Sequence, residues 1–174
     1  MWVFGYGSLL WNPGFTPAEQ HRARLKDYHR SFCMSSIHHR GTPECPGLVL
    51  ALAEAPGAAC TGVAFRVAEG EEDEVLAYLR ERELVSAAYL ERHLPLRLDD
   101  GRVVEALTYV IDMEHDQFVQ LSLEEQAQRI ARATGGRGPN SEYLMNTAAH
   151  LDLLAIRDDD MAWLVTRVLA MRQD

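Results

Sequence analysis

The stretch that decides the fold is residues 94–111, LPLRLDDGRVVEALTYVI. Two runs rich in β-forming residues, 94–98 and 103–111, flank the triplet Asp99-Asp100-Gly101. An Asp-Gly pair between such runs is the strongest short signal for a β-hairpin. The stretch therefore predicts an antiparallel ladder at the centre of the chain.

Further strands are predicted before this hairpin. They cover residues 2–6, 25–36, 47–53 and 60–67, and the sequence HHRGTPECP at 38–46 forms a loop between the second and the third. Pro56-Gly57 is a turn signal, so we expect residues 47–67 to form a hairpin of their own.

Helices are predicted mainly in the last third, over residues 71–83, 122–133, 140–154 and 158–172. The second opens with a capping box of Ser122 and Glu125, and Asn140 is the expected N-cap of the third. Strands followed by helices favour an α+β fold with a mainly antiparallel β-sheet or barrel and flanking helices, rather than alternating βαβ units.

Length and charge restrict the classes of function. The 174 residues suit a single domain over 1–174. With 17 Lys+Arg against 26 Asp+Glu, the net charge of −9 disfavours nucleic acid as a partner. The acidic runs at 69–74 and 158–160 are expected to be solvated helix N-termini, where carboxylates complement the helix dipole.

The cysteines and the N-terminus indicate the compartment. Cys33, Cys45 and Cys60 are odd in number and form no CxxC pair, so we expect neither a disulfide framework nor a zinc ribbon. The N-terminus lacks the features of a signal peptide, and no apolar run approaches the ~20 residues that span a bilayer. We expect a soluble, reduced, cytoplasmic protein without a membrane partner.

The first candidate for chemistry is the turn GYGSLL at residues 5–10. It is half of a dinucleotide fingerprint, but the third glycine is replaced by Leu10 and no helix start follows, so the Rossmann interpretation fails. Backbone N–H groups of such a turn can bind a carboxylate or an oxyanion. The alternative is an ordinary β-turn that needs φ > 0 at glycine.

Glu83 is the most informative carboxylate. On a helix over 71–83 it shares one face with Leu76 and Leu79, whereas Glu81 lies on the far side. Burial and the negative end of the helix dipole would raise its pKa, which suits a general base that later acts as an acid. The alternative is a structural ion pair with Arg80, Arg82 or another arginine.

Two other kinds of site are disfavoured. The histidines form no metal-binding cluster, and the adjacent His38 and His39 would point to opposite faces of a strand, so we expect no metal. A hydrolase built on Ser8 and His39 is conceivable, but GYGSL is not the GxSxG nucleophile elbow.

Taken together, these motifs resemble the ChaC-like family of γ-glutamylcyclotransferases. The resemblance is carried by WVFGYGSLLWNPGF at 2–15, residues 30–32, HRGTP at 39–43, residues 46–47, GVAFR at 62–66, LRERELVSAAY at 79–89 and GPNSEYL at 138–144. It spans nearly the whole chain in family order. It implies a γ-glutamylcyclotransferase-like fold, a small-molecule substrate and no cofactor. The segment LVSAAY after Glu83 departs from the shorter, glycine-containing link of eukaryotic members, which bears on the leaving group.

The resemblance also implies roles for residues. The catalytic glutamate of the family falls on Glu83, which the helical wheel selects independently. The substrate-binding loop falls on Tyr6, Gly7, Ser8 and Leu9. Tyr143 is expected to line the same site, with Arg40 and Gly41 at its edge.

The implied reaction is release of 5-oxoproline from glutathione, with Cys-Gly as the second product. Alternatives are a cyclotransferase or hydrolase acting on other γ-glutamyl peptides or amines, and a non-enzymatic regulator that binds a partner through its acidic surface. The sequence leaves the oligomeric state open.

Overall fold

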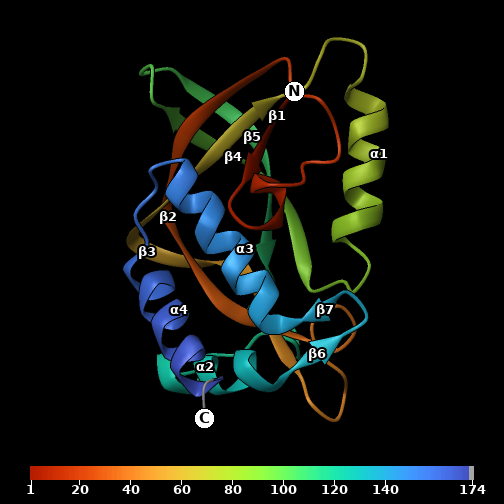
Figure 1. The fold of residues 1–174 in the computed structure, drawn as a ribbon. Helices are drawn as coiled ribbons and strands as arrows, with labels where there is room; N and C mark the ends of the chain where they lie inside the picture. Colours follow the sequence, from red (N-terminus) through yellow and green to blue (C-terminus); the bar gives the residue numbers. More distant parts are fainter. Residues whose placement is uncertain (173–174) are drawn as a thin grey trace. The chain divides into compact units, whose positions relative to one another are not determined.

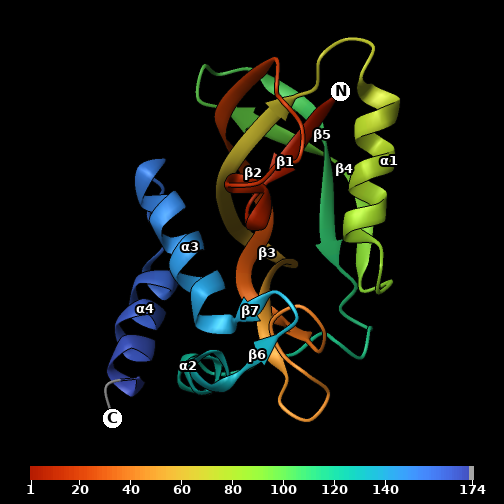
Figure 2. The ribbon, with the colours of Figure 1, turned by 45° about the vertical axis from the view of Figure 1, so that its right-hand side comes forward.

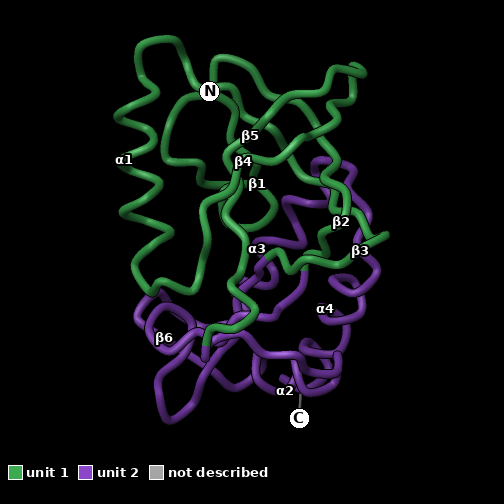
Figure 3. The backbone as a smooth tube through the Cα atoms, turned by 180° about the vertical axis from the view of Figure 1, so that it is seen from behind, with its two compact units in different colours: residues 1–30, 52–115 green, residues 31–51, 116–174 purple. Residues whose placement is uncertain are grey.

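The computed structural model describes residues 1–172, and the chain forms two compact units (Figure 3). Unit 1 comprises residues 1–30 and 52–115, and unit 2 comprises residues 31–51 and the chain from 116 onward. Two long strands, β2 (Glu19–Ser36) and β3 (Gly47–Arg66), contribute residues to both units. A single domain over 1–174 stays a prediction, and its last two residues lie outside the described part.

Strands β1 to β5 form a closed barrel, as the α+β prediction allowed. The strand order is β1-β3-β2-β4-β5, with β1 at Trp2–Gly5, β4 at Tyr89–Leu98 and β5 at Val103–Ile111. The predicted hairpin of β4 and β5 is confirmed, with Tyr89 opposite Ile111 and Gly101 at φ 92° in the turn. One pair, β1 with β5, is parallel, and it places the N-terminal strand beside the hairpin that decides the fold.

The core of unit 1 explains why α1 (Glu72–Glu83) lies along the barrel strands (Figure 1). Val75 and Leu79 of α1 are buried in one hydrophobic cluster with Val3 of β1 and with Leu107 and Tyr109 of β5. Burial of a side chain as large as leucine stabilises the fold by about 2 kcal/mol. The apolar face of α1 therefore fixes the position of its last turn, which ends with Glu83.

The predicted hairpin over 47–67 is wrong, because β3 runs without reversal through Pro56-Gly57. Gly57 has φ 86° and Asp27 of β2 has φ 63°, and the Gly57 amide donates a hydrogen bond to Asp27 Oδ1 at 2.8 Å. The turn-forming residues thus form a local irregularity of a long strand. Pairing of β3 with β2 replaces the pairing of β3 with itself.

Unit 2 contains three helices that pack on one another, α2 (Leu123–Arg132), α3 (Asn140–Leu153) and α4 (Asp159–Met171) (Figure 2). The capping box at the start of α2 is confirmed, since Ser122 Oγ accepts from the Glu125 amide and Glu125 accepts from the Ser122 amide. A two-stranded ladder, β6 (Thr134–Gly135) with β7 (Gly138–Pro139), precedes α3.

The N-cap predicted for α3 is wrong by one residue. Pro139 occupies the N-cap position, and Asn140 is the first helical residue. The Asn140 side chain binds β3 instead: Oδ1 accepts from the Leu48 amide at 2.8 Å and Nδ2 donates to the Leu48 carbonyl at 2.7 Å. The amide therefore joins a helix to a strand 92 residues away in sequence.

The acidic runs, the cysteines and the length of the helices were also subjects of prediction. The acidic runs do supply the first turns of α1 and α4, and Cys33, Cys45 and Cys60 are all free. Within residues 1–172, no helix combines the length and the apolar character needed to cross a membrane.

Candidate active site

The glycine turn after β1 leads into one turn of 3-10 helix, η1 (Ser8–Leu10). Its first internal donor is the Leu10 amide, which donates to the Gly7 carbonyl at 2.9 Å. The amides of Ser8 and Leu9 lie ahead of that donor and are not used by the helical turn itself. Gly7 has φ −135°, so the alternative of a turn with φ > 0 at this glycine is wrong.

Two side chains of the loop are structural. Leu9 is buried in the cluster that also contains Leu79 of α1. Tyr6 is buried, and its hydroxyl donates to the Tyr109 carbonyl of β5 at 2.8 Å. The Tyr6 carbonyl accepts from the Arg30 guanidinium at 3.3 Å. Both side chains are thus committed to contacts within unit 1, and a role of Tyr6 and Leu9 in binding substrate stays a prediction.

The helical wheel placed Glu83 correctly. Leu79 is fully buried and Leu76 is partly buried, whereas Glu81 is exposed. The Glu83 side chain is 16% exposed, at the C-terminal end of α1. The ion pair that stood as the alternative is also present, since Arg82 Nε lies 3.1 Å from Glu83 Oε1.

Sequence reasoning missed the role of Arg82. Its guanidinium donates to Ser8 Oγ at 2.8 Å and forms the ion pair with Glu83, so one side chain connects the glycine turn to the candidate catalytic carboxylate. The spacing indicates only that Arg82, three residues after Leu79, borders the buried face of the helix, and it carries no signal for the contact with Ser8. Ser8 Oγ accepts this bond from a cation, and the hydrolase alternative gains no support from it.

The negative charge of Glu83 contributes to a raised pKa of Tyr109. This tyrosine is buried in β5, and its hydroxyl donates to Glu91 Oε2 at 3.2 Å. Burial raises the pKa of Tyr109, and the negative charges of Glu91 and Glu83 raise it further. Arg80 in turn forms two hydrogen bonds with Glu91, which lower the pKa of that carboxyl. The neutral Tyr109 therefore lies near two carboxylates, Glu83 and Glu91, and each of these carboxylates is paired with an arginine.

Unit 2 brings together the other predicted residues. The Arg40 guanidinium lies 5.7 Å from the centre of the Tyr143 ring and donates to the Pro139 carbonyl at 3.2 Å. The Tyr143 hydroxyl accepts from the Leu50 amide at 3.3 Å. Gly41 is required sterically, because a Cβ there would lie 2.1 Å from the Gly47 nitrogen.

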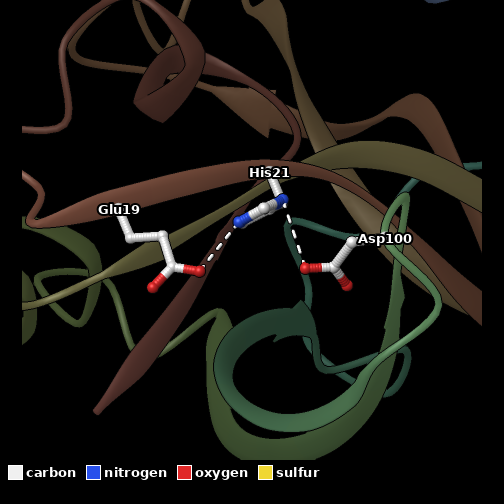
Figure 4. A group of neighbouring side chains, drawn as sticks. All are labelled: Glu19, His21 and Asp100. Atoms are coloured by element: carbon white, nitrogen blue, oxygen red, sulfur yellow. Dashed lines mark hydrogen bonds and ion pairs between the residues drawn. The ribbon is translucent and has the colours of Figure 1, made fainter.

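Three possible metal ligands gather in unit 1, although the spacing of the histidines predicts no metal site. Figure 4 shows the His21 side chain between those of Glu19 and Asp100. The ligand atoms that the three residues offer lie within 4.8 Å of one another. Glu19 is already paired with the guanidiniums of Arg102 and Arg66, and hydrogen bonds from Arg102, His21 and Arg66 lower its pKa to about 2. Hydrogen bonds to Asp99 and Glu19 raise the pKa of His21, which favours a cation over a neutral metal ligand. The group is a surface ion-pair network.

Comparison with known proteins identifies the family. The sequence model described as ChaC-like protein matches residues 1–171. The chain is 37% identical over 169 residues to the glutathione-specific γ-glutamylcyclotransferase of Escherichia coli, covering 97% of this chain and 72% of that protein. It is 36% identical to the glutathione-specific γ-glutamylcyclotransferase 1 of Danio rerio, covering 92% and 83%.

Solved structures agree on the fold. A crystal structure of the yeast γ-glutamyl cyclotransferase specific to glutathione superposes with a TM-score of 0.88 at 24% identity, covering 99% of this chain and 96% of that one. The α+β barrel with flanking helices is therefore the γ-glutamylcyclotransferase fold, as expected. The chain belongs to the ChaC-like protein family.

Proposed function

We propose that the protein is a γ-glutamylcyclotransferase that converts glutathione to 5-oxoproline and Cys-Gly, with Glu83 as general base and acid. The observation that carries this proposal is the largely buried Glu83 carboxylate, linked through Arg82 to Ser8 of the glycine turn. The names of relatives at 31–37% identity support glutathione as the substrate.

The reaction is an intramolecular exchange of amide bonds. The α-amine nitrogen of the γ-glutamyl group attacks its own γ-carbonyl carbon, which forms the five-membered ring. Glu83 accepts the proton from the attacking nitrogen and returns it to the departing cysteine nitrogen as the original amide bond breaks. Atoms balance without water or a cofactor, so orientation of the substrate supplies much of the acceleration.

The glycine turn provides the expected donors for the substrate. The amides of Ser8 and Leu9 precede the first donor of η1 and suit a carboxylate or the oxyanion of the tetrahedral intermediate. A loss of one such donor typically costs about 10²-fold or more in kcat. Gly7, Arg40, Gly41 and Tyr143 remain proposed substrate-binding residues.

The test is to incubate the protein with glutathione, γ-Glu-Ala and γ-Glu-Lys in H₂¹⁸O and identify the products by mass spectrometry. Cyclisation yields 5-oxoproline without ¹⁸O, because no water is consumed, whereas hydrolysis yields ¹⁸O-labelled glutamate. Release of neither product from any substrate would overturn the enzymatic proposal. Binding of a partner protein that survives Glu83→Gln would favour the regulatory alternative.

The role of Glu83 is tested by Glu83→Gln against Glu81→Gln. Both changes remove one negative charge from the same helix, but Glu81 is exposed and lies on the opposite face. We expect Glu83→Gln to fold and to lose about 10²–10⁴-fold in kcat, the range typical of general acid–base catalysis. A folded Glu83→Gln variant with the turnover of Glu81→Gln would remove Glu83 from the mechanism.

A further inference from the structure

We propose that Arg82 is a positioning residue of the reaction, holding the Glu83 carboxylate and the Ser8 turn in one arrangement and keeping that carboxylate charged. This inference rests on the proposed function, because it assigns Glu83 the work of a base. It adds a second functional side chain to the last turn of α1, immediately before the carboxylate.

Arg82 differs from an ordinary surface arginine in its low exposure and in the number of acceptors that its guanidinium contacts. Its side chain is 12% exposed, although it lies in the last turn of a helix. The guanidinium donates to Ser8 Oγ at 2.8 Å, to the Tyr78 hydroxyl at 3.2 Å and to the Asn12 carbonyl. With Glu83 at 3.1 Å, four acceptors surround one planar cation.

These acceptors come from separate segments of unit 1. Ser8 and Asn12 lie 74 and 70 residues from Arg82, and between them they span η1 and the chain that follows it. Gly14 allows the same segment to pack closely against Tyr78 of α1. It has φ 81°, and a Cβ at this position would lie 2.2 Å from the Tyr78 ring. A rigid fork of N–H donors can satisfy several acceptors at once, which a lysine ammonium on a flexible stem does less well.

The second effect of Arg82 is electrostatic. The C-terminal end of α1 is the negative end of its dipole, which disfavours a carboxylate there. A cation 3.1 Å away favours the charged carboxylate, and this is the form that accepts a proton. Among the titratable groups near Glu83 is the neutral Tyr109 of β5, whose pKa is raised by burial and also by the charge of Glu83. Tyr109 in turn binds Glu91, which is paired with Arg80, so the opposite charges of that pair offset each other.

The test is the pH dependence of kcat/KM for Arg82→Met and Arg82→Lys, with glutathione as substrate. Methionine keeps an unbranched apolar side chain but removes the positive charge. Lysine keeps the positive charge but lacks the planar guanidinium with its several N–H donors. The acidic limb of kcat/KM reports the base of the free enzyme. The carboxyl groups of the substrate titrate identically in every variant, so a difference between limbs belongs to the protein.

For Arg82→Met we expect the acidic limb to move to higher pH by about one unit. We also expect the plateau to fall about 10²-fold, the cost of a misplaced catalytic group. Arg82→Lys should keep the limb near that of the wild type while its plateau falls. Arg157→Met is the matched control, because it removes the same charge from a side chain that is 86% exposed, and it should change neither quantity.

The outcomes separate the two proposals. A wild-type protein that releases no 5-oxoproline would overturn the proposed function and this inference with it. An active wild type with an unshifted acidic limb in a folded Arg82→Met variant would overturn the inference alone, since a purely structural role lowers stability without moving the limb. Should the methionine variant not fold, Arg82→Lys decides: a plateau equal to that of Arg157→Met would refute positioning by the fork.

Discussion

Asn140→Ala tests how α3, the helix that carries the predicted site residue Tyr143, is attached within unit 2. Asn140 is fully buried at the start of α3, and its side chain forms hydrogen bonds to both the amide and the carbonyl of Leu48. Leu48 is itself fully buried in β3. Alanine leaves both backbone groups without these partners and without access to water. Tyr143 lies three residues later on the same helix.

The magnitude follows from the two groups left unsatisfied. Each buried backbone donor or acceptor without a partner costs about 1–3 kcal/mol. Alanine recovers about 0.5 kcal/mol through its higher helix propensity. The expected loss in the free energy of unfolding is therefore about 2–5 kcal/mol, a large fraction of the stability of a typical domain.

The assay is urea unfolding followed by circular dichroism, with Asn146→Ala as the matched control. Asn146 carries the same side chain on the same helix but is exposed, so its replacement should change stability by no more than about 0.5 kcal/mol. Equal stabilities for the two variants would refute the view that the Asn140 amide attaches α3 to β3. A changed dependence on urea concentration would instead indicate an altered unfolded state.

Three other predictions concern Gly41, the ion pairs of His21 and the hydroxyl of Tyr143. Gly41→Ala should lower the melting temperature far more than Gly136→Ala, since the first Cβ meets backbone atoms at 2.1 and 2.4 Å and the second meets nothing closer than 3.3 Å. The raised pKa of His21 means that its ion pairs stabilise the protein fully below about pH 6.5. The melting-temperature advantage over His21→Gln should therefore shrink as pH rises towards 9, and an advantage that grows would contradict the assignment. Tyr143→Phe removes the hydrogen bond from the Leu50 amide to the tyrosine hydroxyl, so we expect a loss of about 0.5–1.5 kcal/mol by urea unfolding. It should also raise KM for glutathione more than it lowers kcat, and an unchanged KM would count against substrate binding.

Local signals in the sequence predicted most elements of the fold. The Asp-Gly turn, the capping box at Ser122 and the apolar spacing of α1 each act within a few residues, and all three are confirmed. The hairpin at Pro56-Gly57 failed because a long-range partner, Asp27, binds the Gly57 amide within a continuous strand. A turn signal describes a local preference, and pairing with another strand can override it.

The candidate site was predictable only in part. The helical wheel selected Glu83 over Glu81 because burial of one helix face follows from periodicity alone. It could not reveal that Arg82 contacts Ser8, because 74 residues separate the two and no local spacing encodes that contact. The buried amide of Asn140 was likewise assigned to helix capping, since its partner Leu48 is remote in sequence.

The sequence by itself determined the types of element, the inward face of α1 and the acidic surface that disfavours polyanions. These depend on side-chain periodicity and on net charge, which need no knowledge of distant contacts. Tertiary structure decided the strand order, the parallel closure of β1 on β5 and the environment of Glu83. A carboxylate becomes a candidate base through its surroundings. Arg82 is its neighbour on α1, but the contact of Arg82 with Ser8 and the nearby buried Tyr109 of β5 come from residues remote in sequence.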